Sequence, residues 1–151
     1  MKHLIPAAIA FAMTLGVAGL HADTLPGVKG INHIGLTVPD IAEAETFFTD
    51  VLGCEKATSF GPYRDDTGTF MQDLLDVDPR AVVNQITLMR CGFGSNIELF
   101  SYDAPDQQTV RPRNSDIGGH HIAFYVEDID AAAGLFQGQG HPHADGAVSG
   151  Q

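Results

Sequence analysis

The chain has 151 residues, of which 44% are hydrophobic and 18% are charged, and its formal net charge is −11. This length allows one domain or two small modules, and the composition is that of an ordinary globular protein. The eight Lys and Arg residues are scattered along the chain, whereas binding to a phosphate backbone requires clustered positive charge. Nucleic acid is therefore excluded as a partner.

The first 22 residues differ from the rest of the chain. A short, weakly basic start is followed by an apolar run from Leu4 to Leu20, and the small residue Ala22 suits cleavage by a signal peptidase. The run is shorter than the roughly 20 apolar residues of a membrane anchor. We expect residues 1–22 to be a secretory signal peptide, with an uncleaved tether as the alternative. The mature chain would then work in the periplasm or outside the cell, without stable membrane insertion after cleavage.

The chain has two cysteines, Cys54 and Cys91. In an oxidising compartment they could pair in a disulfide. Two free thiols in neighbouring strands are the alternative, and the sequence leaves both open.

The most informative feature is an internal repeat. Residues 33–44 and 121–132 align at a constant offset of 88, and six of the twelve positions are identical. Such self-similarity predicts a duplicated structural module.

Each copy predicts a strand followed by a helix. Apolar residues alternate in the strand, an aspartate stands where a helix N-cap belongs, and apolar residues at helical spacing lead to a glycine stop. In the first copy these residues are Ile34, Leu36 and Val38, then Asp40 with Glu43, then Ile41, Ala44, Phe48, Val51 and Leu52, and Gly53. In the second copy they are Ile122, Phe124 and Val126, then Asp128, then Ile129, Ala132, Leu135 and Phe136, and Gly138.

Three further strands follow the first helix, near residues 54–60, 81–91 and 96–102. The long segment between the first two, residues 61–80, is predicted to fold back over apolar surface, with Phe70, Met71, Leu74 and Leu75 suggesting a short helix. The second copy lacks these three strands, so we expect it to be incomplete. The predicted organisation is a signal peptide (1–22), a linker (23–30), a first module (31–103), a second linker (104–117) and an incomplete second module (118–151). The predicted fold class is α+β.

Three side chains on the strands suggest a metal site. His33 and His121 hold equivalent positions, opposite the apolar face, so related modules would direct both to one shared concave surface. Glu98 lies in an otherwise apolar strand, where a carboxylate is costly without a charged partner or a metal. Two histidines and a carboxylate suit Zn, Ni, Co, Mn or Fe(II). The sequence predicts one divalent metal ion bound by His33, Glu98 and His121, in preference to the rival His120; ordinary core or surface histidines are the alternative.

Three segments resemble the vicinal oxygen chelate superfamily, which includes glyoxalase I, methylmalonyl-CoA epimerase, extradiol dioxygenases and fosfomycin and bleomycin resistance proteins. They are INHIGLTVPDIAEAETFFTDVLGCE, NIELFSY and GGHHIAFYVEDIDAA, and the resemblance covers residues 31–140. It implies paired βαβββ modules forming an open, barrel-like sheet around one metal. His33 and Glu98 would come from the first module and His121 from the second. A fourth ligand, usually Glu, would lie on the last strand of the second module, which this sequence does not contain.

The resemblance also implies a function. A metal that chelates two adjacent oxygens of a small substrate stabilises negative charge on them, and Glu98 would be the catalytic residue that moves the proton next to the carbonyl. This favours an isomerase or lyase similar to glyoxalase (lactoylglutathione lyase), although a signal peptide makes a glutathione adduct less secure as substrate. The alternatives are a ring-cleaving extradiol dioxygenase and a non-enzymatic small-molecule-binding resistance protein. Exposed sheet edges are compatible with a homodimer.

Overall fold

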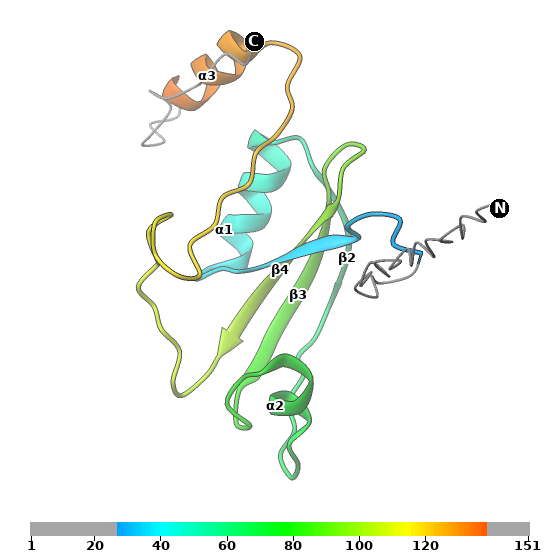
Figure 1. Ribbon diagram of the computed structural model, residues 1–151, viewed down its shortest axis with the longest axis vertical. Helices are drawn as coiled ribbons and strands as arrows, with labels where there is room; N and C mark the ends of the chain where they lie inside the picture. Colours follow the sequence, from blue (N-terminus) through cyan, green and yellow to red (C-terminus); the bar gives the residue numbers. More distant parts are fainter. Residues whose placement is uncertain (1–26, 139–151) are drawn as a thin grey trace, which may run out of the picture. The chain divides into compact units, whose positions relative to one another are not determined.

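The computed structural model describes residues 27–138 (Figure 1). The predicted signal peptide and the tail that carries His141 and His143 lie outside the described residues. The elements in chain order are β1 (His33–Thr37), α1 (Ile41–Thr46), the π-helical turn η1 (Phe47–Val51), β2 (Glu55–Phe60), α2 (Phe70–Leu75), β3 (Val82–Arg90), β4 (Asn96–Asp103) and α3 (Ile129–Gly138).

The chain forms two compact units. The first comprises the chain up to Tyr63 together with Val83–Ser101, and it contains the sheet with helix α1 and η1. The second comprises Arg64–Val82 together with the chain from Tyr102 onward, and it contains α2 and α3.

The first unit is built on one open, four-stranded sheet of order β1-β4-β3-β2. Strand β1 pairs in parallel with β4, and β2 pairs antiparallel with β3. Strands β3 and β4 are neighbours joined by a short turn, residues 91–95. The α+β class, the strand–helix–strand–strand–strand order of the first module and the strand positions are thus confirmed.

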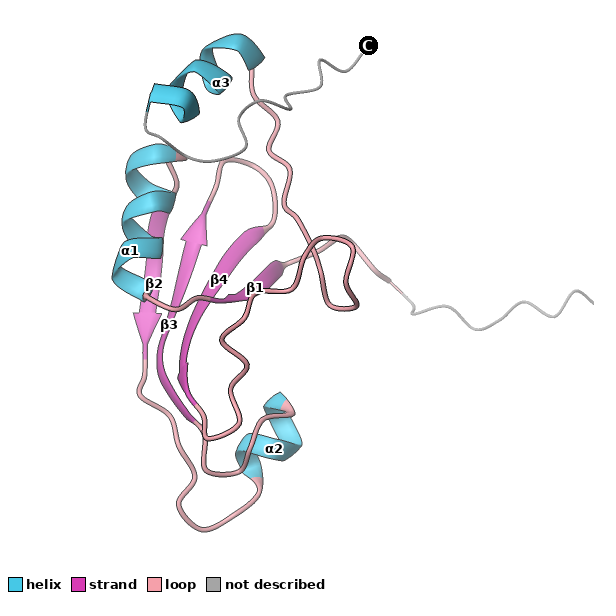
Figure 2. Cartoon of the chain, turned by 90° about the vertical axis from the view of Figure 1, so that its left-hand side faces the viewer, coloured by secondary structure: helices cyan, strands magenta, loops and turns pink. Residues whose placement is uncertain are grey.

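Helix α1 packs on one face of this sheet (Figure 2). The register opposes Ile34 to Ile97 and Leu36 to Leu99, so these side chains share the face that the helix covers. Ile97 and Leu99 are 3% and 0% exposed. The opposite face therefore carries the residues in between, including His33 and Glu98.

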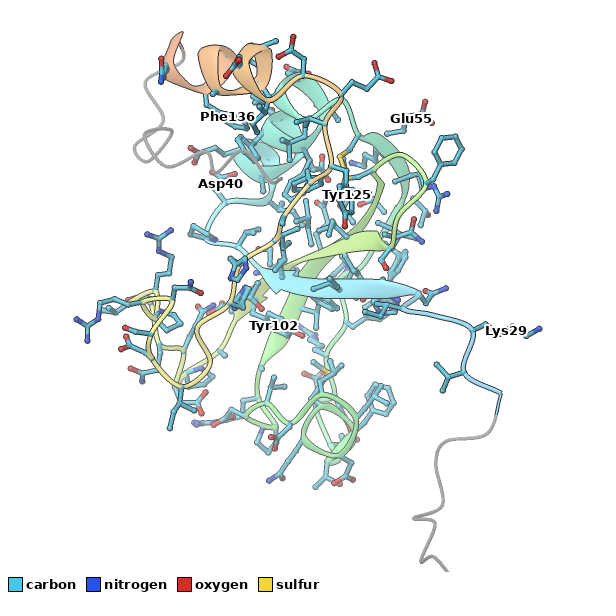
Figure 3. All side chains as sticks on the ribbon, turned by 45° about the horizontal axis from the view of Figure 1, so that its top comes forward. Lys29, Asp40, Glu55, Tyr102, Tyr125 and Phe136 are labelled. Atoms are coloured by element: carbon cyan, nitrogen blue, oxygen red, sulfur yellow. A yellow bond between two sulfur atoms is a disulfide. The ribbon has the colours of Figure 1, made fainter. Side chains whose placement is uncertain are left out.

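The ends of the helix follow the sequence signals. The carboxylate of Asp40, labelled at the start of α1 in Figure 3, accepts a hydrogen bond from the Glu43 backbone N–H at 3.0 Å. At the other end Gly53 has a φ of 66°, and the Cys54 N–H donates to the Phe48 carbonyl at 2.8 Å, a Schellman-type ending that the left-handed glycine allows. The last turn widens, because the Leu52 N–H bonds to the Phe47 carbonyl five residues back.

A disulfide joins Cys54 and Cys91, whose Cα atoms are 4.4 Å apart. These residues directly precede β2 and directly follow β3, and Glu55 pairs with Arg90 in the ladder. The register thus brings the two sulfurs together, which resolves the alternative that the sequence left open.

Helix α1 is also tied to the sheet by a polar network around Glu45. Its carboxylate accepts hydrogen bonds from Thr87 Oγ1 at 2.6 Å, from Gln85 Nε2 at 2.8 Å and from Lys56 Nζ at 2.8 and 2.9 Å. Burial by itself would raise the pKa of Glu45, but the hydrogen bonds and the charge of Lys56 outweigh it, so the pKa is lowered.

Replacing Glu45 by Gln should therefore change how stability depends on pH. A carboxylate whose pKa is lower in the folded state contributes stability above its unfolded value of 4.5, and this contribution is lost as the pH falls through the folded value. We expect Glu45→Gln to unfold at a lower urea concentration than the parent at about pH 7, and the difference to shrink near pH 3. The contributions of the other carboxylates to the pH dependence of stability are the same in both proteins and cancel in the difference. Glu43→Gln, on the exposed side of the same helix, is the control; a difference that grows toward low pH would contradict the prediction.

In the second unit, the predicted short helix of the long loop is confirmed as α2. Asp65 lies before the helix and accepts hydrogen bonds from the backbone N–H groups of Thr67, Gly68 and Phe70, the last of which is the first residue of α2. Met71 is fully buried. Helix α3 is likewise where the second copy predicted it, and Asp128 accepts from the Ala131 N–H at 2.9 Å. Its cap thus repeats that of Asp40 at the offset of 88.

The strand predicted for the second copy is wrong for the described structure. Residues 119–128 lie outside helices and strands, and the side chains of Phe124, Tyr125 and Val126 are 43%, 107% and 49% exposed. An alternating pattern supplies the faces of a strand, but a strand also needs a hydrogen-bonded neighbour. The described sheet consists of β1, β4, β3 and β2, and this segment pairs with none of them.

Across residues 27–138, no helix is both long enough and apolar enough to cross a bilayer.

Candidate metal centre

Two of the three predicted ligands meet on the face of the sheet that α1 does not cover. His33 begins β1, and Glu98 lies on β4 opposite Gly35 in the parallel register. His33 Nε2 and Glu98 Oε2 are 3.3 Å apart, and the two side chains are 45% and 18% exposed. Since Gly35 has no side chain, Glu98 can reach across to the histidine next to it. The pair is therefore a product of the parallel register between β1 and β4.

The ring of Phe100 borders this pair. A Cβ atom at Gly35 would lie 3.3 Å from Phe100 Cε2, a separation at which one of the two groups must shift slightly. Glycine at this position therefore lets the aromatic ring lie directly against the β1 backbone. Phe100 could not be identified from the sequence, because alternation assigns a residue to a face but does not give its neighbours.

Asn32 is a second residue that sequence reasoning missed. Its Oδ1 lies 2.8 Å from His33 Nδ1, on the side of the ring away from Glu98. Successive residues of an extended chain point to opposite faces, so alternation argues against such a contact between neighbours. Asn32 can make this contact because it lies just before β1, where the alternation of the strand does not yet apply.

His121 lies in the second unit, where its Nδ1 is 3.4 Å from Asn114 Oδ1. The rival His120 has its Nδ1 3.2 Å from the Gly118 carbonyl oxygen. Within residues 27–138, no three His, Cys, Asp or Glu side chains are gathered into a group that could hold a metal ion. The structure thus brings His33 and Glu98 together, and the role of His121 stays a prediction.

The chemistry of the pair fits a metal ion. An imidazole nitrogen and a carboxylate oxygen each bind zinc at about 2.0–2.2 Å, so two ligands of a tetrahedral ion lie about 3.4 Å apart. The observed 3.3 Å between Nε2 and Oε2 agrees with that spacing. The Asn32 contact at the other ring nitrogen is of the kind that orients ligand histidines in metalloproteins.

The two arginines of the long loop are engaged locally. Arg80 makes a bidentate contact to Asp78, with distances of 3.0 and 2.9 Å, and these hydrogen bonds lower the pKa of Asp78 to about 2. Arg64 pairs with Asp66 at 3.2 Å. Substrate binding by either would compete with these pairs.

The chain is similar to one family model and to two known proteins. The family model described as "Glyoxalase/Bleomycin resistance protein/Dioxygenase superfamily" matches residues 32–151. The 2-epi-5-epi-valiolone epimerase of an Actinomyces species is 45% identical over 115 residues, which are 76% of this chain and 61% of the epimerase. The uncharacterised protein YaeR of Escherichia coli K12 is 32% identical over 106 residues, 70% of this chain and 67% of YaeR.

Among solved structures, the crystal structure of SMU.1112c is similar with a TM-score of 0.49 and 22% identity, covering 75% of this chain and 76% of that one. The chain spans 61% of the length of the Actinomyces epimerase that it matches. The family match over residues 32–151 covers well over half of the sequence. The chain therefore belongs to the glyoxalase/bleomycin resistance protein/dioxygenase superfamily.

Proposed function

We propose that the protein is a metal-dependent isomerase of the epimerase type, which moves a proton at the carbon beside the carbonyl of a small substrate with oxygens on two adjacent carbons. The observation that carries this proposal is the His33–Glu98 pair, 3.3 Å apart on the open face of the sheet. The similarity to a 2-epi-5-epi-valiolone epimerase supports the reaction class, and 2-epi-5-epi-valiolone is the first substrate to test.

In this proposal His33, Glu98 and His121 hold one divalent ion, of Ni, Zn, Mn, Co or Fe(II). When bound, the ion would supply Lewis-acid stabilisation of the negative charge that develops on the substrate oxygens. The Glu98 carboxylate is the base: the C–H bond breaks, the proton passes to a carboxylate oxygen, and the bonding electron pair moves toward the carbonyl oxygen. Return of a proton to the opposite face of the same carbon completes the inversion. Because the Glu98 side chain is 18% exposed, the proton that it holds can exchange with solvent before that return.

The metal site predicts the metal content of two variants. The full chain, purified without chelators, should contain about one equivalent of a divalent metal by elemental analysis, and His33→Ala should lose most of it, because a ligand is removed. His120→Ala, which alters an exposed histidine beside the third predicted ligand, should keep the parent content. Equal metal in the parent and in His33→Ala would remove His33 from the site. If the parent holds iron and consumes oxygen with a catechol, the ring-cleaving alternative replaces the epimerase.

We further propose that the protein works outside the cytoplasm. The support is the disulfide between Cys54 and Cys91, since such bonds persist in oxidising compartments and are rare in the cytosol. Fractionation of cells that express the full chain, followed by mass measurement of the mature protein, tests this. Recovery of the uncleaved chain in the cytosolic fraction would contradict it.

A further inference from the structure

We propose that Asn32 is a positioning residue that fixes the His33 ring so that Nε2, and not Nδ1, is the metal-binding nitrogen. This inference rests on the proposed metal site and adds a residue outside the ligand set. Asn32 Oδ1 lies 2.8 Å from His33 Nδ1, while His33 Nε2 is the ring atom that faces Glu98 at 3.3 Å.

The chemistry of the two groups sets the direction of the hydrogen bond. An amide oxygen can only accept, and a neutral imidazole carries one N–H and one lone pair. In the neutral ring the contact places the proton on Nδ1 and leaves the Nε2 lone pair facing the carboxylate. A lone pair and a carboxylate oxygen that face each other repel unless a proton or a metal cation lies between them. A metal ion at that position would therefore replace the proton that otherwise joins Nε2 to Glu98.

Asn32 is itself held in place by the backbone. Its carbonyl oxygen accepts a hydrogen bond from the Asn96 N–H at 3.0 Å, and the carbonyl oxygen of Ile31 accepts one from Ser95 Oγ at 2.9 Å. The segment before β1 is therefore tied to the turn before β4. Since β4 also carries Glu98, the same strand fixes the carboxylate and the residue that orients the histidine.

A similar contact occurs at the other predicted ligand histidine. Within the second unit, Asn114 Oδ1 lies 3.4 Å from His121 Nδ1. The offset of 88 would place the counterpart of Asn32 at His120, so Asn114 reaches the ring from a different position in the sequence. In both units the amide oxygen meets Nδ1, and this leaves Nε2 for a metal.

Zinc binding to the full chain, with the histidine rings labelled with nitrogen-15, tests the inference without an activity assay. Long-range proton–nitrogen spectra distinguish protonated, unprotonated and metal-bound ring nitrogens, and the loss of a signal in His33→Gln assigns it to this ring. In the parent, zinc should shift Nε2 of His33 while Nδ1 stays protonated. The zinc dissociation constant is measured in parallel by competition with a chromophoric chelator.

Asn32→Ala should weaken zinc binding by about 10- to 100-fold, the usual cost of removing such an outer partner, and Nδ1 should lose its fixed proton signal. Asn32→Asp should retain the parent affinity and the Nδ1 proton, because a carboxylate oxygen accepts the same hydrogen bond. Asn84→Ala, which alters an exposed asparagine on β3, is the matched control and should behave as the parent.

The outcomes separate this inference from the metal site. Zinc that binds the parent through Nδ1 of His33 would overturn the role of Asn32 and leave the site standing. An Asn32→Ala variant with the parent's zinc affinity and ring spectrum would do the same. A parent chain in which zinc changes no His33 signal would overturn the proposed site and this inference with it. Loss of affinity in Asn32→Ala together with rescue in Asn32→Asp supports it.

Discussion

Replacing Glu98 by Gln should lower the rate of proton transfer beside the substrate carbonyl by about 100- to 10,000-fold, the usual contribution of a positioned general base. Glutamine keeps the size of the side chain and one carbonyl oxygen, but an amide cannot take up the proton. The loss should appear in kcat, because a proton transfer made only in the transition state contributes little to the binding of the substrate.

The measurement is exchange of the substrate's C–H hydrogen for deuterium, followed by proton NMR in heavy water with the substrate named above and the metal identified by elemental analysis. Glu55→Gln is the matched control, since Glu55 is exposed at the start of β2 and projects away from the sheet (Figure 3). The control should exchange at the parent rate. A Glu98→Gln variant that exchanges as fast as the parent would remove Glu98 from the reaction, whatever its metal content.

The first module could be predicted because local and global signals agree in it. The alternation of Ile34 and Leu36 sets the faces of β1, Asp40 and Gly53 mark the ends of the helical segment, and the same alternation places Glu98 on the face of His33. A position opposite the apolar residues of its own strand is enough to assign each residue to the other face of the sheet. It is not enough to give the 3.3 Å between them, which depends on the parallel register with Gly35 opposite Glu98.

The remaining features depend on contacts that no local pattern encodes. The segment with Phe124 and Val126 has the alternation of a strand, but a strand forms only with a hydrogen-bonded neighbour, and this segment pairs with none of the four described strands. Asn32 contacts the residue next to it in sequence from a backbone position that is held by Asn96 and Ser95, which are more than sixty residues away. The disulfide could be decided only once the register had placed Glu55 opposite Arg90.

Removal of that disulfide should have the largest effect on stability. Cys54 and Cys91 are 37 residues apart, and the chain-entropy model gives about 4 kcal/mol for closing a loop of this length in the unfolded state. Domains of this size are stable by roughly 5–15 kcal/mol, so the loss is a large share of the total. The Cys54→Ala, Cys91→Ala double variant should therefore unfold at a much lower urea concentration than the oxidised parent.

Reduction of the parent separates the loss of the cross-link from the loss of side-chain packing. Cys54 is 5% exposed, so its replacement by Ala also leaves a small space in the core and adds a packing cost. The parent in excess thiol keeps both side chains and loses only the bond, so its urea midpoint should fall most of the way to that of the double variant. The double variant should not respond to thiol at all. Equal midpoints for the oxidised and reduced parent would show that the cross-link does not stabilise the fold.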